Sequence, residues 1–365
     1  MIKEHSMGSE TDINAMPKKN PLSLQIDLSK FEKATDEEKR QQDVMSSSTT
    51  FFKDGMKKLM KNPLAVGSIV VLVLIILMIV VAPMVVPYKY SQIISVNGKR
   101  DTGAKNLMPF EYSEMEQAYM QQGGKVFPHI LGTDELSRDY FIRVVYGTKV
   151  SLLVGVFASL VVLIIGVLYG SISGYAGGRT DMIMMRIVDI IYSLPDLLVI
   201  ILLSVVFRET LDVTKSPFLH RLGTNMISIF IVFGLLYWVG MARLVRGQIL
   251  SIKENEYILA ARAIGAKPGH IIRTHVLPNC ISVIIIATAL EVPSAIFTES
   301  FLSFIGLGVA LPMPSLGSLA STAREGMQSY PLKLVFPAVM ICLIVLAFNL
   351  LGDGLRDAFD PKLRK

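Results

Sequence analysis

The sequence predicts an all-α integral membrane protein with six transmembrane helices. Its 365 residues are 52% hydrophobic and only 18% charged, whereas an ordinary soluble domain is about 25% charged. Six largely apolar runs recur along the chain, each close to the roughly 20 residues that a helix needs to cross a bilayer. The two cysteines, Cys280 and Cys342, form no spaced framework, so neither a disulfide scaffold nor a zinc site is indicated.

The six predicted spans differ in regularity. Because the bilayer core offers no water to the backbone, each span must be helical. We place the spans at residues 64–88, 150–173, 187–207, 222–242, 280–304 and 334–352. The third and the fifth are the least regular, since prolines remove helix hydrogen bonds in both. The prolines concerned are Pro195 and Pro293.

Basic residues set the predicted orientation. The net charge of +6 arises largely from Lys and Arg in short segments before the first span, between the second and third, between the fourth and fifth, and after the sixth. Such segments stay in the cytoplasm. The sequence therefore predicts that both termini are cytoplasmic, and the basic excess does not indicate nucleic-acid binding.

The other segments complete the predicted organisation. Residues 1–50 are polar and poor in aromatics, as is typical of a flexible cytoplasmic tail. Residues 51–88 hold the first span and, before it, an amphipathic stretch that forms either an interfacial helix or a cytoplasmic extension of that span. Residues 89–149 are predicted to be an extracellular loop region. Residues 150–352 are predicted to be the core domain of five spans, and residues 353–365 a cytoplasmic tail.

The cytoplasmic loop between the fourth and fifth spans, residues 254–279, is the most informative stretch. Its apolar residues recur at helical spacing and predict one stripe on a short helix: Tyr257, Ala260, Ala261 and Ile264. Gly265 ends this helix, and Pro268 prevents its resumption. A second helical piece then leads back into the membrane. The stripe serves either to pack against the protein's own span ends or to dock in a partner's groove.

This loop resembles the EAA loop of ATP-binding-cassette importer membrane subunits. The matching residues are Ala260, Ala261, Gly265, Leu277 and Pro278. Leu259 stands where the general pattern has Glu, and Glu256 lies one turn earlier, which resembles the peptide-importer form E-x-x-x-A-A-R-A-x-G. The resemblance implies that residues 256–268 form the helix that couples to an ATPase. The implied coupling residues are Glu256, Tyr257, Ala260, Ala261, Arg262 and Gly265.

Other stretches resemble the same branch of the family. Residues 131–152 are similar to the GTD-x-x-GRD…G-x-R-x-SL run, with Ser137 and Lys149 in place of the usual Gly and Arg. Residues 174–195, 299–308 and 349–362 also fit. The resemblance covers about residues 51–362 and is strongest to the C-type membrane subunit of an oligopeptide permease.

The resemblance implies a type I importer permease fold and a place in a heteromeric complex in the plasma membrane of a prokaryote. Residues 150–352 would be the core permease domain and would form half of a peptide pathway. A homologous B-type permease subunit would form the other half. Two cytoplasmic ATPases would use ATP and Mg²⁺, and an extracellular solute-binding protein would deliver the peptide.

The chain itself has no pattern for catalysis. A phosphate-binding loop needs G-x-x-x-x-G-K-[ST], and the closest approach, at Gly178-Arg179-Thr180, lacks the first glycine and the lysine. His270 and His275 are interpreted as solvated helix residues rather than metal ligands. We therefore expect a transport subunit that is not an enzyme and binds no cofactor or metal.

Four carboxylates lie within the predicted spans: Asp189, Asp196, Glu291 and Glu299. Carboxylates inside a membrane face a wet cavity or pair at a helix interface. For Asp189, pairing with an Arg or a backbone group is the favoured interpretation. For Glu299, a place along the peptide path and a structural role both stay open.

Three other functions compete with oligopeptide import. A dipeptide or nickel-chelate importer subunit would share the same motifs. A self-sufficient secondary transporter would use the carboxylates as an ion relay, but it predicts inverted repeats, which the sequence does not show. A membrane scaffold would recruit a partner through the cytoplasmic loop, but the other matching stretches argue against it.

Overall fold

The computed structural model describes residues 51–210, 224–308 and 313–359. The predicted tail at 1–50 and the first residues of the fourth span lie outside these residues, as does the end of the C-terminal tail. The side chains of Phe51, Asp196 and Arg208 are also outside the description.

The regular secondary structure of the described residues is helical apart from one small hairpin and two isolated β-bridges. The hairpin pairs β1 (Ser95–Val96) with β2 (Lys99–Arg100). The helices, in chain order, are α2 (Phe51–Leu59), α3 (Pro63–Val85), α4 (Glu114–Gln121), α5 (Tyr140–Ala176), α6 (Gly178–Ser193), α7 (Asp196–Thr210), α9 (Thr224–Leu236), α10 (Trp238–Ile252), α11 (Glu256–Ala263), α12 (Pro268–Ile271), a π-helical turn (Ile272–Val276), α13 (Leu277–Phe304), α14 (Leu316–Glu325) and α15 (Pro331–Phe359).

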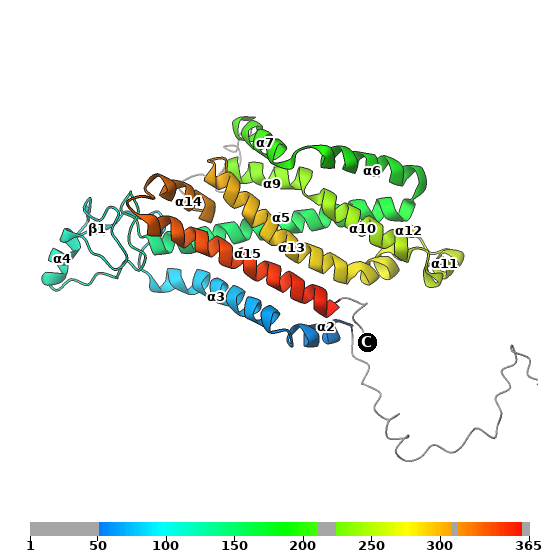
Figure 1. Cartoon of the computed structure of the whole chain (residues 1–365), viewed down its shortest axis with the longest axis horizontal. Helices are drawn as coiled ribbons and strands as arrows, with labels where there is room; N and C mark the ends of the chain where they lie inside the picture. The colour runs from blue at the N-terminus through cyan, green and yellow to red at the C-terminus, as the bar shows by residue number, and fades with distance from the viewer. Residues whose placement is uncertain (1–50, 211–223, 309–312, 360–365) are drawn as a thin grey trace, which may run out of the picture. The chain divides into compact units, whose positions relative to one another are not determined.

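The long helices of residues 51–359 run side by side in a bundle (Figure 1). Among the described residues, five helical segments are long and apolar enough to cross a membrane, and the bent pair α6–α7 makes a sixth if it counts as one span. This agrees with the six predicted spans. The second begins at Tyr140 rather than at Val150, so α5 extends into the segment predicted to be extracellular loop. Figure 1 places α4 and β1 at one end of the bundle and α11 at the other.

The irregular third span breaks where the sequence predicts it. α6 and α7 meet at an angle of 89°. Leu194, between them, has extended backbone angles (φ −78°, ψ 141°), because a residue that precedes proline is driven out of the helical region. Pro195 thus divides this span into two helices.

A run of glycines fixes the close packing of α5 against α10. Gly166, Gly170 and Gly174 are spaced by four residues and lie on one face of α5. A Cβ at Gly170 would lie 2.5 Å from the carbonyl oxygen of Ala242. Small residues at this spacing let two membrane helices approach closely. The position of α10, and of the loop that follows it, depends on this contact.

The amphipathic stretch before the first span is a helix of its own. α2 ends at Leu59, and the side chain of Asn62 caps α3 by accepting a hydrogen bond of 3.0 Å from the backbone N–H of Leu64. α2 is therefore not a continuous extension of the span. Leu59 is buried with Phe359 of α15. Phe52, Met56 and Met60 are exposed.

Candidate functional site

The cytoplasmic helix predicted from residues 254–279 is α11, and a buried isoleucine holds it in place. Asn255 occupies its N-cap position and Glu256 its first turn, where the helix dipole favours negative charge. Ile258 is fully buried in a cluster with Ile249 of α10 and Ile271 of α12. Ile258 is not among the residues of the predicted apolar stripe, although it follows Tyr257 directly in the chain. This side chain anchors α11 to the bundle.

The bundle covers only one edge of the predicted apolar stripe of α11. Ala261 points inward and is buried beside Ile258. Tyr257 and Leu259 are 44% and 47% exposed, and Ile264 is 86% exposed. Glu256, Ala260 and Arg262 are exposed as well. These exposed apolar side chains are available to contact another molecule.

Gly265 ends α11 because of its backbone conformation. Its φ is +84°, and nothing lies within 4 Å of the position that a Cβ would take. The N–H of Gly265 donates to the carbonyl of Arg262 (2.9 Å), and the N–H of Ala266 donates to that of Ala261 (3.1 Å). These two bonds form a Schellman cap, which satisfies carbonyls at the helix end.

The chain then returns to the membrane through an unbroken helical path. α12 begins at Pro268 itself, the residue expected to keep the chain out of a helix, because proline is well tolerated at the first helical position. The π-helical turn then leads directly into α13. The amide nitrogen of Asn279 donates to the carbonyl of His275 (2.6 Å) and to the hydroxyl of Tyr257 (3.2 Å). This second bond ties α11 to the start of α13. Among the described residues there is no group of three His, Cys, Asp or Glu side chains that could hold a metal ion.

Two ion pairs join α6 to α10. Arg246 donates from Nε and Nη2 to the two carboxylate oxygens of Asp181, both at 2.6 Å. Nearer the break in the span, Nη2 of Arg243 donates to Asp189 at 2.7 Å, and the guanidinium lies over the ring of Tyr192. The side chain of Asp189 is 52% exposed. Asp189 therefore has an arginine partner but is not enclosed by the chain. The side chain of Asp196 lies outside the described residues.

Glu299 has a different environment from that of Asp189. It is fully buried, and it accepts hydrogen bonds from the hydroxyls of Ser151 (2.8 Å) and Ser303 (2.7 Å). The Ser151 hydroxyl also accepts a bond from the backbone N–H of Leu316. Glu299 thus links α13 to α5 and α14. Glu291 is only partly buried, and no contact joins it to Glu299.

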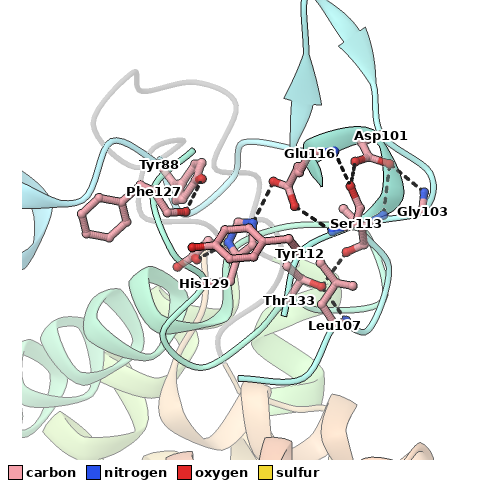
Figure 2. Close-up of polar contacts among 12 residues, drawn as sticks. Tyr88, Asp101, Gly103, Leu107, Tyr112, Ser113, Glu116, Phe127, His129 and Thr133 are labelled. Carbon is pink, nitrogen blue, oxygen red and sulfur yellow. Dashed lines mark hydrogen bonds and ion pairs between the residues drawn. The ribbon is translucent and has the colours of Figure 1, made fainter. Parts of the chain in front are cut away.

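The region predicted to be extracellular contains a second polar cluster, which was not predicted from the sequence. Figure 2 shows His129 between two carboxylates, with Tyr88 stacked on its ring. Nδ1 of His129 lies 2.9 Å from Asp139 and Nε2 lies 3.0 Å from Glu116, and all three side chains are buried. Burial alone would lower the pKa of His129, but the hydrogen bonds to Asp139 and Glu116 outweigh it and raise this pKa to about 9. The imidazole is therefore protonated at neutral pH.

We define residues 88–139 as the external lobe. Further hydrogen bonds around the His129 cluster join distant parts of this lobe. Burial raises the pKa of Glu116, yet its hydrogen bonds from His129 and the backbone of Ser113 bring the pKa below its usual value. The Tyr88 hydroxyl donates to the carbonyl of Phe127 (2.8 Å). The Ser113 hydroxyl donates to one carboxylate oxygen of Asp101, and the other oxygen accepts a hydrogen bond from the backbone N–H of Gly103. Figure 2 shows that these groups point toward one another.

The signature segment at residues 131–143 joins the external lobe to α5. Asp134 accepts hydrogen bonds from the backbone N–H groups of Leu136 and Arg138, both at 2.9 Å. Between them, Ser137 has φ +57°, a left-handed conformation that favours glycine. This explains why the related pattern has glycine at this position.

The comparisons with known proteins agree with one another. Residues 166–365 match the family described as binding-protein-dependent transport system inner membrane component. Residues 50–109 match the N-terminal transmembrane domain of oligopeptide transport permease C. An oligopeptide transport system permease protein of Bacillus subtilis is 39% identical over 314 residues, which cover 86% of this chain and 90% of that protein.

Two further relatives show a similar degree of likeness. A dipeptide transport system permease protein of Bacillus subtilis is 41% identical over 314 residues, covering 86% of each chain. An oligopeptide transport system permease protein of Escherichia coli strain K12 is 39% identical over 313 residues, covering 86% of this chain and 92% of that protein. The likeness therefore extends over nearly the whole length of these relatives.

Proposed function

This chain belongs to the binding-protein-dependent transport system inner membrane components, and we propose that it is a membrane-spanning permease subunit of an ATP-driven oligopeptide importer. The relatives are named for oligopeptide and dipeptide transport, which supports a peptide as the substrate. The chain is a multi-pass membrane protein. Nickel-chelate import and secondary transport are not favoured by any of these relatives.

The exposed apolar side chains of α11 and its C-cap residue are the observation that carries this proposal. Tyr257, Leu259 and Ile264 present apolar surface outward, while Ile258 fixes the helix from the inside. A helix held in this way transmits a push or pull on its outer face to α10 and α13. We propose that a cytoplasmic ATPase subunit binds this face and that its ATP-driven closure moves the spans.

The other parts of the proposed complex follow from the same assignment. Two ATPases would supply ATP hydrolysis with Mg²⁺, so this subunit needs no catalytic group or cofactor of its own. A homologous B-type subunit would complete the pathway, and an extracellular solute-binding protein would deliver the peptide to the end of the bundle that holds the external lobe. In this proposal α11 and both termini lie in the cytoplasm.

The first test is to identify the partners of the full chain. The tagged protein is purified gently from its native membrane, and co-purifying proteins are identified by mass spectrometry after cross-linking. We expect a second six-span subunit and one or two ATPases with a phosphate-binding loop. A lone chain or a simple homo-oligomer would overturn the proposal.

A second test measures the substrate. ATP-dependent uptake is followed in proteoliposomes that contain the purified complex and its binding protein, with peptides of two to six residues. We expect uptake of peptides longer than two residues. Uptake of dipeptides alone would assign the chain to dipeptide import instead.

A further inference from the structure

A cavity of about 220 Å³ lies at the external end of the bundle, among the signature segment, α14 and the start of α15. Neither the coupling helix nor the His129 cluster uses it. Its lining combines apolar side chains such as Leu319 with charged ones. The charged lining residues are Asp134, Glu135, Arg138, Arg143 and Lys333.

Positive charge exceeds negative charge in the buried part of this lining. Arg143 is 3% exposed and Lys333 is 9% exposed. Asp134 is the only buried carboxylate among the lining residues, and Nε of Arg138 already donates to it at 2.7 Å; Glu135 is exposed. The ammonium of Lys333 bonds to the side-chain oxygen of Asn106, which is neutral. Buried charges are costly unless they are paired, so the cavity favours an anion.

Arg143 has a hydrogen-bond donor available for such an anion. Its Nη1 donates to the carbonyl of Tyr90 at 3.0 Å. Its Nε lies 3.3 Å from Oδ2 of Asp134, but it makes no hydrogen bond to any of the described residues although it is buried. A buried donor without an acceptor costs free energy, and a guanidinium binds the two oxygens of a carboxylate or phosphate in parallel.

We propose that this cavity binds one anionic group, a carboxylate or a phosphate at the end of a larger molecule, between Arg143 and Lys333. The volume is below the roughly 300–1,000 Å³ of sites that enclose a whole drug-sized ligand, so only the end of the ligand enters. Leu319 and Tyr140 contact the apolar part next to the charge. The cavity lies where α5 and α15 begin, at one end of the bundle, so the anion comes either from a phospholipid headgroup or from the C-terminus of a peptide.

The test uses the full complex as it is purified in detergent, and binding is measured as a shift in thermal unfolding. The probes form two matched pairs: phosphatidylglycerol against phosphatidylcholine, and trialanine against its C-terminal amide. We expect the anionic member of at least one pair to stabilise the protein. Lys333→Gln should weaken that binding by roughly tenfold or more, the size of effect that one charged contact gives. Lys99→Gln removes an exposed charge from the same lobe and should change nothing.

A second variant keeps the test decisive if Lys333→Gln does not fold. Thr322 lines the cavity and is exposed, so Thr322→Glu introduces a carboxylate there without removing a buried group. We expect this variant to unfold at a higher temperature without any probe and to bind the probes at least roughly tenfold more weakly.

The probe that stabilises the protein identifies the source of the anion. A response to phosphatidylglycerol alone assigns a lipid phosphate, a response to free trialanine alone assigns a peptide carboxylate, and a response to both shows that either enters. The proposal is overturned if no anionic probe stabilises the wild type. It is also overturned if Lys333→Gln and Thr322→Glu both bind the probes as the wild type does.

Discussion

The two ends of the bundle handle their polar and apolar groups in opposite ways. In the external lobe, buried charges are paired within the chain, with His129 between Glu116 and Asp139. At α11, apolar side chains are left on the surface, with Ile264 86% exposed. The His129 cluster is therefore satisfied within the chain, whereas α11 leaves apolar side chains exposed, which we propose that another molecule covers.

This difference predicts which substitutions should affect transport and which should affect the stability of the fold. Substitutions on the outer face of α11 should leave folding intact, because the side chains there contact little of their own chain. Substitutions in the His129 cluster should destabilise the lobe, because each leaves a buried charge without its partner. The predictions below test this contrast, beginning with the largest expected effect.

A negative charge on the outer face of α11 should abolish transport. Leu259→Asp and Ile264→Asp place a carboxylate on the surface that we propose the ATPase contacts, and binding would have to desolvate it. We expect ATP-dependent uptake to fall by roughly 30-fold or more, since the loss of a central contact costs about 2 kcal/mol or more. The measurement is peptide uptake by proteoliposomes, together with the amount of protein inserted.

The control is the same charge at a nearby position outside the face. Ser251→Asp lies at the exposed end of α10 and should leave uptake unchanged. Ala261→Asp should behave differently from both, because Ala261 is buried beside Ile258 and a carboxylate there should reduce stability. Normal uptake by Leu259→Asp and Ile264→Asp would remove α11 as the coupling surface.

Removing the imidazole should destabilise the external lobe strongly. His129→Ala leaves Glu116 and Asp139 buried without their shared partner, and breaking a buried ion pair in this way costs about 3–5 kcal/mol. The measurement is limited proteolysis within residues 101–139, at pH 7. His270→Ala removes an exposed imidazole from α12, at the other end of the bundle (Figure 1), and should leave the proteolysis rate unchanged. Equal resistance of His129→Ala and wild type would contradict the ion-pair assignment.

The same cluster should make the stability of the lobe depend on pH. The pKa of His129 is about 9 in the folded protein and about 6.5 in an unfolded chain, so protonation favours the folded lobe. The contribution is complete below about pH 6.5 and is lost as pH rises through about 9. Its size is about 3 kcal/mol. Proteolysis of the lobe should accelerate over this range in the wild type, and much less in His129→Gln.

The sequence predicts the spans and the helix α11 well because their signals are local. Apolar length gives the spans, Pro195 gives the break between α6 and α7, and Gly265 gives the end of α11. The glycines at 166, 170 and 174 were a further local signal of close helix packing, which the sequence analysis did not use.

The polar clusters could not be predicted, because their members are far apart in the chain. Ser151 and Glu299 are separated by 148 residues, and no spacing rule brings them together. Glu116, His129 and Asp139 lie on loops and helix ends whose positions depend on the whole lobe. The inward direction of Ala261 was also missed, because spacing gives a shared stripe but does not say which half of the stripe the bundle covers.

Replacing Gly265 should have a moderate effect. An alanine at φ +84° would clash with nothing, since no atom lies within 4 Å of its Cβ, so the cost is the left-handed backbone itself, about 1–2 kcal/mol. Asparagine tolerates this conformation better and should retain more uptake than alanine. The measurement is uptake alongside hydrogen exchange of residues 256–266. Equal loss with alanine and asparagine would show that the side-chain space, and not the backbone, matters to a partner.

The smallest effect should come from Ser137, at the join between the external lobe and α5. Its φ of +57° costs an L-residue about 1 kcal/mol, and glycine avoids that cost but loses more chain entropy on folding, about 0.5–1 kcal/mol. Ser137→Gly should therefore raise the stability of the lobe by at most a few tenths of a kcal/mol, measured by proteolysis at pH 7. Ser137→Ala keeps the strained backbone and should give no gain. A loss above about 1 kcal/mol in Ser137→Gly would mean that the buried serine hydroxyl itself stabilises the lobe.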